Sequence, residues 1–263
     1  MKNLKKILAM TLVCVMLLAV LAACGAKEQL IIGITDYFPM NYKDDNGKWT
    51  GFETDFAREV CKILGFEAEF TEIDWGSKEV EVNAGNIDAV WNGMTANPER
   101  AESMDLSTRY MRNRQVMVVR ADDADKYSSA DGLAGASIVA EDGSAGLELA
   151  ETDAFFSAGN ITPVDGQIKA VLEVKSLTAD IAVIDYVMAG NLLKKGTDYA
   201  GLVMIDLDFE EEEFAIALRK NSDGDENAKI TLKELNDAIK KLTDNGKLQE
   251  IADKYGLGDL IIK

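Results

Sequence analysis

Short apolar runs alternate with amphipathic segments along most of this chain. Runs of strand-like composition predict buried strands at residues 30–34, 67–73, 87–91, 115–119, 137–140, 181–184, 202–205 and 214–218. Residues 51–64 instead place their apolar side chains at helical spacing, and Gly65 then provides a typical helix end. Strand and helix signals that alternate in this way predict an α/β fold with mostly parallel sheets.

Two segments fit this alternation less well. Residues 78–82 alternate charged and apolar side chains, a pattern that predicts a strand. Residues 221–229 are polar, and they lack a glutamate where a calcium-binding loop has its twelfth ligand, so they indicate a solvated loop. After them, two amphipathic stretches predict helices over residues 232–242 and 248–255.

Charge and composition exclude several kinds of partner and site. The net charge of −18 disfavours nucleic acids and anionic lipid surfaces as partners. The chain has no histidine, which excludes Ser-His-Asp and Cys-His catalysis and histidine-bound zinc. Only Cys61 lies outside the N-terminal region among the 3 cysteines, so no internal disulfide is expected. No Gly-rich nucleotide-binding motif occurs, and we expect neither a cofactor nor a metal.

The N-terminus has the pattern of an export signal. Residues 1–6 are basic and residues 7–21 are almost entirely apolar, a run shorter than the roughly 20 residues that cross a bilayer as a helix. Residues 21–24, Leu-Ala-Ala-Cys, resemble the lipobox of bacterial lipoproteins. This resemblance implies a signal peptide over residues 1–23, a lipid on Cys24, and a short tether over residues 24–29. The folded part would then sit outside the cytoplasmic membrane.

Residues 91–100 carry the clearest candidate chemistry. They follow a predicted strand, and we expect Gly93 to leave backbone N–H groups accessible in a turn. Thr95 adds a hydroxyl, and Arg100 adds a planar set of donors that matches a carboxylate. Together these groups suit one small anion, although the same residues could form a strand, a loop and a surface arginine.

Residues 51–64 resemble the signature of the family 3 bacterial solute-binding proteins, which deliver amino acids to ABC importers. The matching positions are Gly51, Phe52, Glu53, Thr54, Asp55, Phe56, Val60, Cys61 and Leu64. Other features follow in the family's order from residue 30 to about residue 256. The resemblance implies a two-lobed periplasmic-binding-protein fold of type II with two hinge strands. Lobe 1 would comprise residues 30–117 and 215–263, and lobe 2 residues 118–214.

The same resemblance implies a ligand site made by both lobes. Lobe 1 would hold the carboxylate of an amino acid on the segment with Gly93 and Thr95 and on Arg100. Lobe 2 would add Ser144, which precedes a helical run, and Asp185, which would bind the ammonium group at the end of a strand.

Tyr37 and Trp75 would supply aromatic walls for this site, and Asn92 is a further candidate. The chain departs from the family at two positions. Ala145 stands where a second hydroxyl is usual, and Glu141 stands near the place of a frequent glutamine.

The expected function is capture of a polar L-amino acid by closure of the lobes, followed by delivery to an ABC permease. We expect a monomer that is anchored through Cys24 and is not an enzyme. One alternative is a dehydratase acting on small carboxylates, with Glu141 or Asp142 as its acid. Another is a lipid-anchored amino-acid sensor. The identity of the amino acid stays open, although Asp36, Glu53 and Glu141 suggest a polar or cationic side chain.

Overall fold

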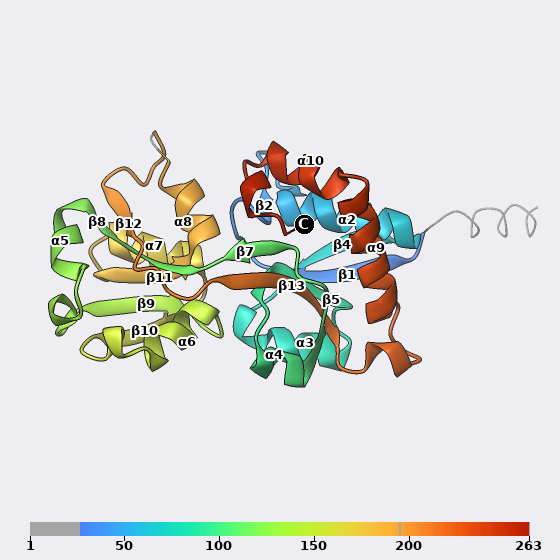
Figure 1. The fold of residues 1–263 in the computed structure, drawn as a ribbon, viewed down its shortest axis with the longest axis horizontal. Coiled ribbons are helices and arrows are strands. Elements are labelled where there is room, and N and C mark those ends of the chain that lie inside the picture. Colours follow the sequence, from blue (N-terminus) through green and yellow to red (C-terminus); the bar gives the residue numbers. More distant parts are fainter. Residues whose placement is uncertain (1–26, 195, 263) are drawn as a thin grey trace, which may run out of the picture.

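Two α/β lobes, joined by two crossing segments, make up the fold (Figure 1). The computed structural model describes residues 27–194 and 196–262. The predicted signal peptide and Cys24 lie outside the described residues. None of the described helices combines the length and the apolar character that crossing a membrane requires.

The first lobe is built on a sheet with the strand order β4-β1-β5-β13-β6, and β7 also pairs with β13. Its strands are β1 (Gln29–Ile34), β4 (Glu67–Glu72), β5 (Ala89–Thr95), β6 (Met104–Leu106), β7 (Met111–Asn113) and β13 (Glu212–Arg219). A small hairpin of β2 (Tyr42–Lys43) and β3 (Trp49–Thr50) lies beside it. The runs that predicted strands in this lobe therefore do form them.

Helices cover both faces of this sheet. In Figure 1, α2 (Phe52–Leu64) and α10 (Lys247–Lys254) lie above it, α9 (Leu232–Asp244) runs down the right-hand side of the lobe, and α3 (Lys78–Ala84) and α4 (Pro98–Ser103) lie below. The strand predicted at residues 78–82 is wrong, because this segment is the start of α3. Val82 is buried but Val80 is 69% exposed, so the alternating valines do not mark one buried strand face.

The second lobe has a sheet with the order β10-β9-β11-β8-β12. Its strands are β8 (Gln115–Arg120), β9 (Ser137–Glu141), β10 (Asn160–Val164), β11 (Ile181–Asp185) and β12 (Leu202–Ile205). Its helices are α5 (Ala124–Tyr127), α6 (Ala145–Thr152), α7 (Gln167–Lys175) and α8 (Tyr186–Leu192). Short 3-10 helices complete the described elements: η1 (Trp75–Ser77), η2 (Ala121–Asp123), η3 (Ala130–Leu133), η4 (Ala154–Phe156), η5 (Ser222–Gly224) and η6 (Gly258–Leu260).

The sheets are less parallel than the sequence predicted. β1 runs parallel to β4 and β5, and β9 runs parallel to β10 and β11. By contrast, β13 is antiparallel to its neighbours, and so is β8. These two strands enter their sheets from the other lobe, so the usual strand-helix-strand connection does not set their direction.

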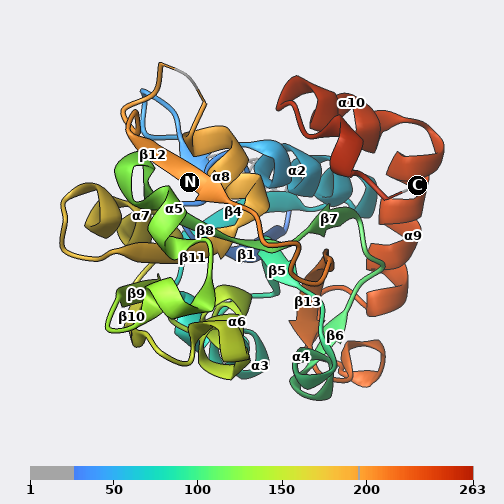
Figure 2. The same cartoon turned by 60° about the vertical axis from the view of Figure 1, so that its left-hand side comes forward.

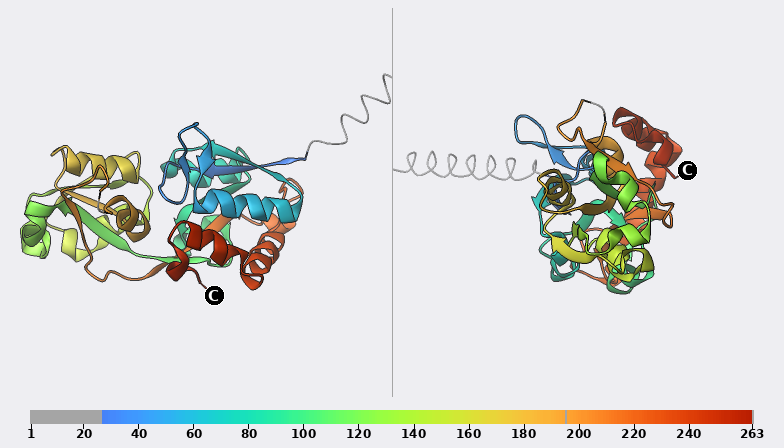
Figure 3. Two further views of the ribbon diagram at one scale, coloured as in Figure 1. Left: turned by 90° about the horizontal axis from the view of Figure 1, so that it is seen from above. Right: turned by 90° about the vertical axis from the view of Figure 1, so that its left-hand side faces the viewer.

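The two crossing segments lie side by side along one edge of the molecule (Figures 1 and 3). One passes from β7 to β8 through Arg114, and the other is residues 206–211, between β12 and β13. The Arg114 guanidinium donates to both carboxylate oxygens of Asp206, at 3.1 and 2.9 Å from Nε. The lobe boundary expected after residue 117 falls inside β8, since Gln115 already pairs with Asp185 of β11.

Candidate functional site

A cavity lies between the lobes at the ends of β5, β9 and β11. Seven of the predicted ligand-binding residues line it, together with three others: Trp75, Asn92, Gly93, Thr95, Arg100, Ser144 and Asp185, with Glu141, Ala145 and Gln167. The enclosed space is about 10 Å³, room for about one water molecule. A molecule the size of an amino acid therefore enters only when the lobes move apart.

Arg100 reaches this cavity from the first turn of α4. Asn97 caps the helix by accepting from the Arg100 backbone N–H at 2.8 Å, and Pro98 occupies its first turn. The guanidinium is 5% exposed and donates to the carbonyls of Thr95 at 2.7 Å and Gly143 at 3.2 Å. It forms no ion pair with the described residues, and burial lowers its pKa. The surface arginine considered from the sequence is wrong, and this buried cation is available to an anion.

Asp185 presents the opposite charge at the end of β11. It is 4% exposed and accepts hydrogen bonds from the side-chain amides of Asn113 at 2.6 Å, Gln115 at 2.8 Å and Gln167 at 2.5 Å. No described lysine or arginine pairs with it, and burial raises its pKa. Three neutral donors hold this carboxylate in place without neutralising its charge, so it can still attract a cation.

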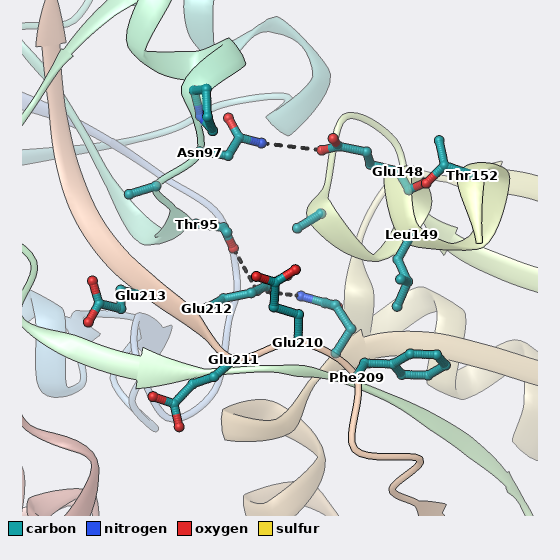
Figure 4. A pocket seen from close by; sticks show the side chains of 14 residues that line it. Thr95, Asn97, Glu148, Leu149, Thr152, Phe209, Glu210, Glu211, Glu212 and Glu213 are labelled. Carbon is teal, nitrogen blue, oxygen red and sulfur yellow. Dashed lines mark hydrogen bonds between the residues drawn. The ribbon is translucent and has the colours of Figure 1, made fainter.

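A second carboxylate shares these amides. Glu212, the first residue of β13 directly after the other crossing segment, accepts from Asn113 at 3.1 Å and from Gln115 at 3.0 Å. It also accepts from the Thr95 hydroxyl at 2.9 Å, so the hydroxyl proton of Thr95 is directed at Glu212 (Figure 4). Sequence reasoning missed Asn113, Gln115 and Glu212. The polar residues 113–115, directly before an apolar strand at the expected crossing, were a usable signal.

Gly93 differs from its predicted role. It lies within β5 with φ 55°, and a Cβ here would approach Tyr37 Cε1 to 2.4 Å. Its N–H donates to both oxygens of the Glu53 carboxylate, at 2.8 and 3.0 Å. The expectation of a free N–H at Gly93 is therefore wrong. Glycine is required here because the Tyr37 ring covers the strand.

The side chain of Asn92 is held within lobe 1, whereas the Tyr37 ring covers Gly93 with its hydroxyl toward Asp185 of lobe 2. Asn92 donates to the Thr35 hydroxyl at 2.7 Å and accepts from the Asn41 amide at 3.0 Å, so both ends of its amide have partners within the lobe. Tyr37 is buried, and its hydroxyl has no hydrogen-bond partner among the described residues. Burial, followed by the nearby charge of Asp185, raises the pKa of Tyr37 well above its usual value. The Tyr37 hydroxyl therefore lies next to Asp185, although Tyr37 is not among the residues that line the cavity.

The family signature forms the layer beneath the site. Glu53, at the start of α2, is fully buried and accepts from Gly93, from the Tyr110 hydroxyl and from the Asn41 amide. Burial raises the pKa of Glu53 to about 7. Thr54 donates to Asn41 at 2.8 Å. These residues therefore fix β5 in position for the site.

Ser144 and Trp75 complete the cavity from opposite lobes. Ser144 is the N-cap of α6, and its hydroxyl accepts from the Leu147 N–H at 3.0 Å. The start of this helix therefore faces the cavity with its positive end. Trp75 is buried, and the ammonium of Lys78 lies 4.8 Å from its ring centroid. Burial lowers the pKa of Lys78 to about 8.

Direct contacts hold the lobes together around the cavity. The Gly143 carbonyl in lobe 2 accepts from two cations of lobe 1, Arg100 at 3.2 Å and Lys78 at 2.9 Å. Asn97 donates to Glu148 of α6 at 3.3 Å (Figure 4). Figure 2 shows α6 close to α3, in agreement with the Lys78 contact. The structure is thus a closed arrangement of the two lobes.

A larger groove of about 500 Å³ adjoins the cavity (Figure 4). It shares Thr95 and Ala145 with the cavity and runs between α6 and the second crossing segment. Its charged lining residues are all glutamates: Glu148, Glu210, Glu211, Glu212 and Glu213. Within residues 27–194 and 196–262, no cluster of cysteine, aspartate and glutamate is arranged to hold a metal ion.

Comparison with known proteins agrees with this architecture. The chain is 31% identical to the arginine-binding extracellular protein ArtP of Bacillus subtilis (strain 168), over 91% of this chain and 93% of that protein. A substrate-binding protein of an ABC uptake transporter from Streptococcus pneumoniae, solved with bound histidine, aligns with a TM-score of 0.79 at 28% identity. That alignment covers 89% of this chain and 95% of the other.

A third similar structure is an ancestral amino acid-binding protein described as a precursor of cyclohexadienyl dehydratase. It aligns at 29% identity with a TM-score of 0.77, over 86% of this chain and 95% of that chain. These similarities confirm the predicted two-lobed periplasmic-binding-protein fold. The model of the bacterial extracellular solute-binding proteins, family 3, matches residues 30–258, and the chain belongs to that family.

Proposed function

We propose that this protein captures a free L-amino acid between its lobes and delivers it to an ABC importer. The observation that carries the proposal is the pair Arg100 and Asp185. Within the described part of the chain, a buried cation without an anion partner and a buried anion without a cation partner line one cavity. An α-amino acid carries the two complementary charges on adjacent groups, so a single ligand satisfies both residues.

In this proposal the ligand carboxylate binds Arg100 and the positive end of α6 at Ser144. The ammonium group binds Asp185, and the Trp75 ring packs against the carbon stem. Each hydrogen bond between charged groups contributes on the order of 1.5–3 kcal/mol. A few such bonds supply the roughly 8 kcal/mol that a micromolar dissociation constant represents.

Binding and closure are coupled in the proposed mechanism. Arg100 and Trp75 belong to lobe 1, so the open protein offers them to the ligand first. Rotation about the crossing segments then brings Ser144 and Asp185 onto the ligand. The bonds from Arg100 and Lys78 to the Gly143 carbonyl, at 3.2 and 2.9 Å, form only in the closed arrangement and favour it. A permease would recognise this closed form.

Cellular placement is part of the proposal. Residues 1–23 act as a signal peptide, Cys24 carries the lipid, and residues 24–29 tether a monomer outside the cytoplasmic membrane. Mass spectrometry of the protein from a producing bacterium tests this arrangement. We expect an N-terminal Cys24 peptide with acyl chains, and we expect Cys24→Ser to release the protein from the membrane. An unmodified Cys24 would refute the anchor and leave the ligand site untouched.

Isothermal titration calorimetry tests the ligand site. The chain from Gly25 onward is suitable, because every described strand and helix begins at Gln29 or later. It is titrated with the common L-amino acids, cystine and ornithine, after a thermal melt has shown that it is folded. The ligand that binds is then tested as its amide, which lacks the carboxylate, and as its N-acetyl form, which lacks the ammonium group.

We expect one or a few amino acids to bind with micromolar affinity or better, and both blocked forms to bind at least 100-fold more weakly. A folded protein that binds no amino acid would refute the proposal. So would equal binding of the blocked forms. Incubation with small hydroxy- and keto-carboxylates tests the dehydratase alternative, and we expect no turnover.

A further inference from the structure

One carboxylate in the cavity has no role in binding the backbone groups of an amino acid. Glu141, at the end of β9, is 4% exposed and lines the cavity with Arg100 and Asp185. No described lysine or arginine forms an ion pair with its carboxylate, and a hydrogen bond from the neutral Gln167 amide lowers the pKa of Glu141 without supplying a counter-charge. A buried carboxylate without a counter-charge is unfavourable unless a ligand supplies one.

We infer that Glu141 binds the end of the ligand's side chain and restricts the site to amino acids with a cationic side chain. This inference rests on the proposed function and deepens it. Glu141 would then be a specificity-determining residue, separate from the groups that hold the carboxylate and the ammonium.

The arrangement of charges supports this role. The negative charges that raise the pKa of Arg100 include those of Glu148, Glu212 and Asp185. Asp185 is also the strongest acidic neighbour of Glu141. Asp185 therefore acts on both Arg100 and Glu141, and all three residues line the same cavity. A ligand held by Arg100 and Asp185 through its backbone groups would extend its side chain toward Glu141.

Neighbouring cations leave Glu141 available. The charge of Lys78 lowers the pKa of Glu141, yet the Lys78 ammonium donates to the carbonyls of Trp75 at 3.2 Å and Gly143 at 2.9 Å. The Gln167 amide, which also acts on Glu141, donates to Asp185 at 2.5 Å.

Protonation gives a second, independent measure of this contact. Burial and the charge of Asp185 raise the pKa of Glu141 to about 8, while Lys78 and Gln167 lower it and Asp74 raises it. At pH 7 much of Glu141 is therefore protonated before binding. A cationic side chain favours the carboxylate form, so its binding at pH 7 should release a proton, and its affinity should rise with pH up to about 8.

The test compares arginine with citrulline, which has nearly the same shape and no charge, by calorimetry on the chain from Gly25 onward. We expect arginine, or ornithine and lysine as shorter cations, to bind at least 30-fold more tightly than citrulline. Titrations in phosphate and in Tris at pH 7 measure the released proton. Glu141→Gln should reduce the preference to less than 3-fold and abolish the proton release, whereas the exposed control Glu151→Gln should change neither.

Each outcome decides the inference. Equal binding of arginine and citrulline by the unaltered protein would overturn it and leave the proposed function standing. A preference that survives Glu141→Gln would overturn it as well. Failure to bind any amino acid would instead refute the proposed function. If Glu141→Gln does not fold, the ligand preference and the proton release of the unaltered protein still decide the question.

Discussion

Buried charges occur in two layers of this protein, and the two layers treat them differently. Beneath the site, Glu53 accepts hydrogen bonds from a backbone N–H, a hydroxyl and an amide. At the crossing segments, the half-buried side chains of Arg114 and Asp206 form a bidentate ion pair. At the cavity surface, Glu141 has no described cation paired with it, and Arg100 donates only to carbonyl groups.

The difference separates charges that support the fold from charges that await a ligand. A buried charge with full hydrogen bonding holds neighbouring segments in one geometry. A buried charge without a counter-charge destabilises the protein until a ligand completes it. Family membership alone does not make this distinction, since Glu53 lies in the family signature although it supports the site from beneath.

The largest effect is expected for Arg100→Met. Loss of the buried cation should weaken binding of the amino acid by about 4 kcal/mol, roughly 1,000-fold, because the ligand carboxylate would be buried without a partner. The free energy of unfolding should change by less than about 1 kcal/mol, since Arg100 has no anion partner to leave behind. Calorimetry and urea unfolding measure the two quantities. Retained affinity would contradict the carboxylate site, and the exposed Arg58→Met is the matched control.

Glu53→Ala should show the opposite behaviour. It leaves Gly93, Tyr110 and Asn41 without their acceptor in the core. We therefore expect the free energy of unfolding to fall by about 3 kcal/mol. Urea unfolding of this variant and of Glu59→Ala, on the same helix, makes the comparison. A loss of stability no greater than that of Glu59→Ala would show that the Glu53 network does not support the fold.

The fold was largely predictable from the sequence. Buried strands such as residues 181–184 are continuous apolar runs, and α2 shows a clear helical period with glycine at its end. The α3 segment was misread from its pattern because a helix of 7 residues is too short to show its period. The antiparallel direction of β8 and β13 was not predictable from local pattern, because it depends on which lobe each strand comes from.

The site was predictable in part. Arg100, Ser144 and Asp185 do line one cavity, because each lies at the end of a strand or the start of a helix that faces the other lobe. What local sequence did not reveal is the partner of each polar group. The Gly93 N–H donates to Glu53, which is 40 residues away in the chain. The Thr95 hydroxyl donates to Glu212, which is 117 residues away. Local sequence does not reveal such distant partners.

Titration of Glu53 sharpens the contrast between the layers. Its pKa of about 7 in the folded protein exceeds the ordinary value of 4.5, so its contribution to stability is fully present below pH 4.5 and is lost as pH rises through 7. Between pH 5 and pH 7 this group alone should lower the free energy of unfolding by about 2 kcal/mol. Urea unfolding at pH 5 and at pH 7 measures this change. The free energy of unfolding of the unaltered protein should fall between the two pH values by about 2 kcal/mol more than that of Glu53→Gln. Equal decreases in the two proteins would contradict the raised pKa.

The smallest effect concerns a side chain that belongs to both layers. Ser144 caps α6 and lines the cavity, so Ser144→Ala should reduce stability by about 1 kcal/mol and also weaken binding several-fold. Thr231→Ala removes the cap of α9, which lies away from the cavity, and should reduce stability equally without altering affinity. Urea unfolding and calorimetry on both variants separate the two roles. If the two variants bind the ligand equally well, Ser144 belongs only to the supporting layer, and the cavity surface is made by the charged residues and Trp75.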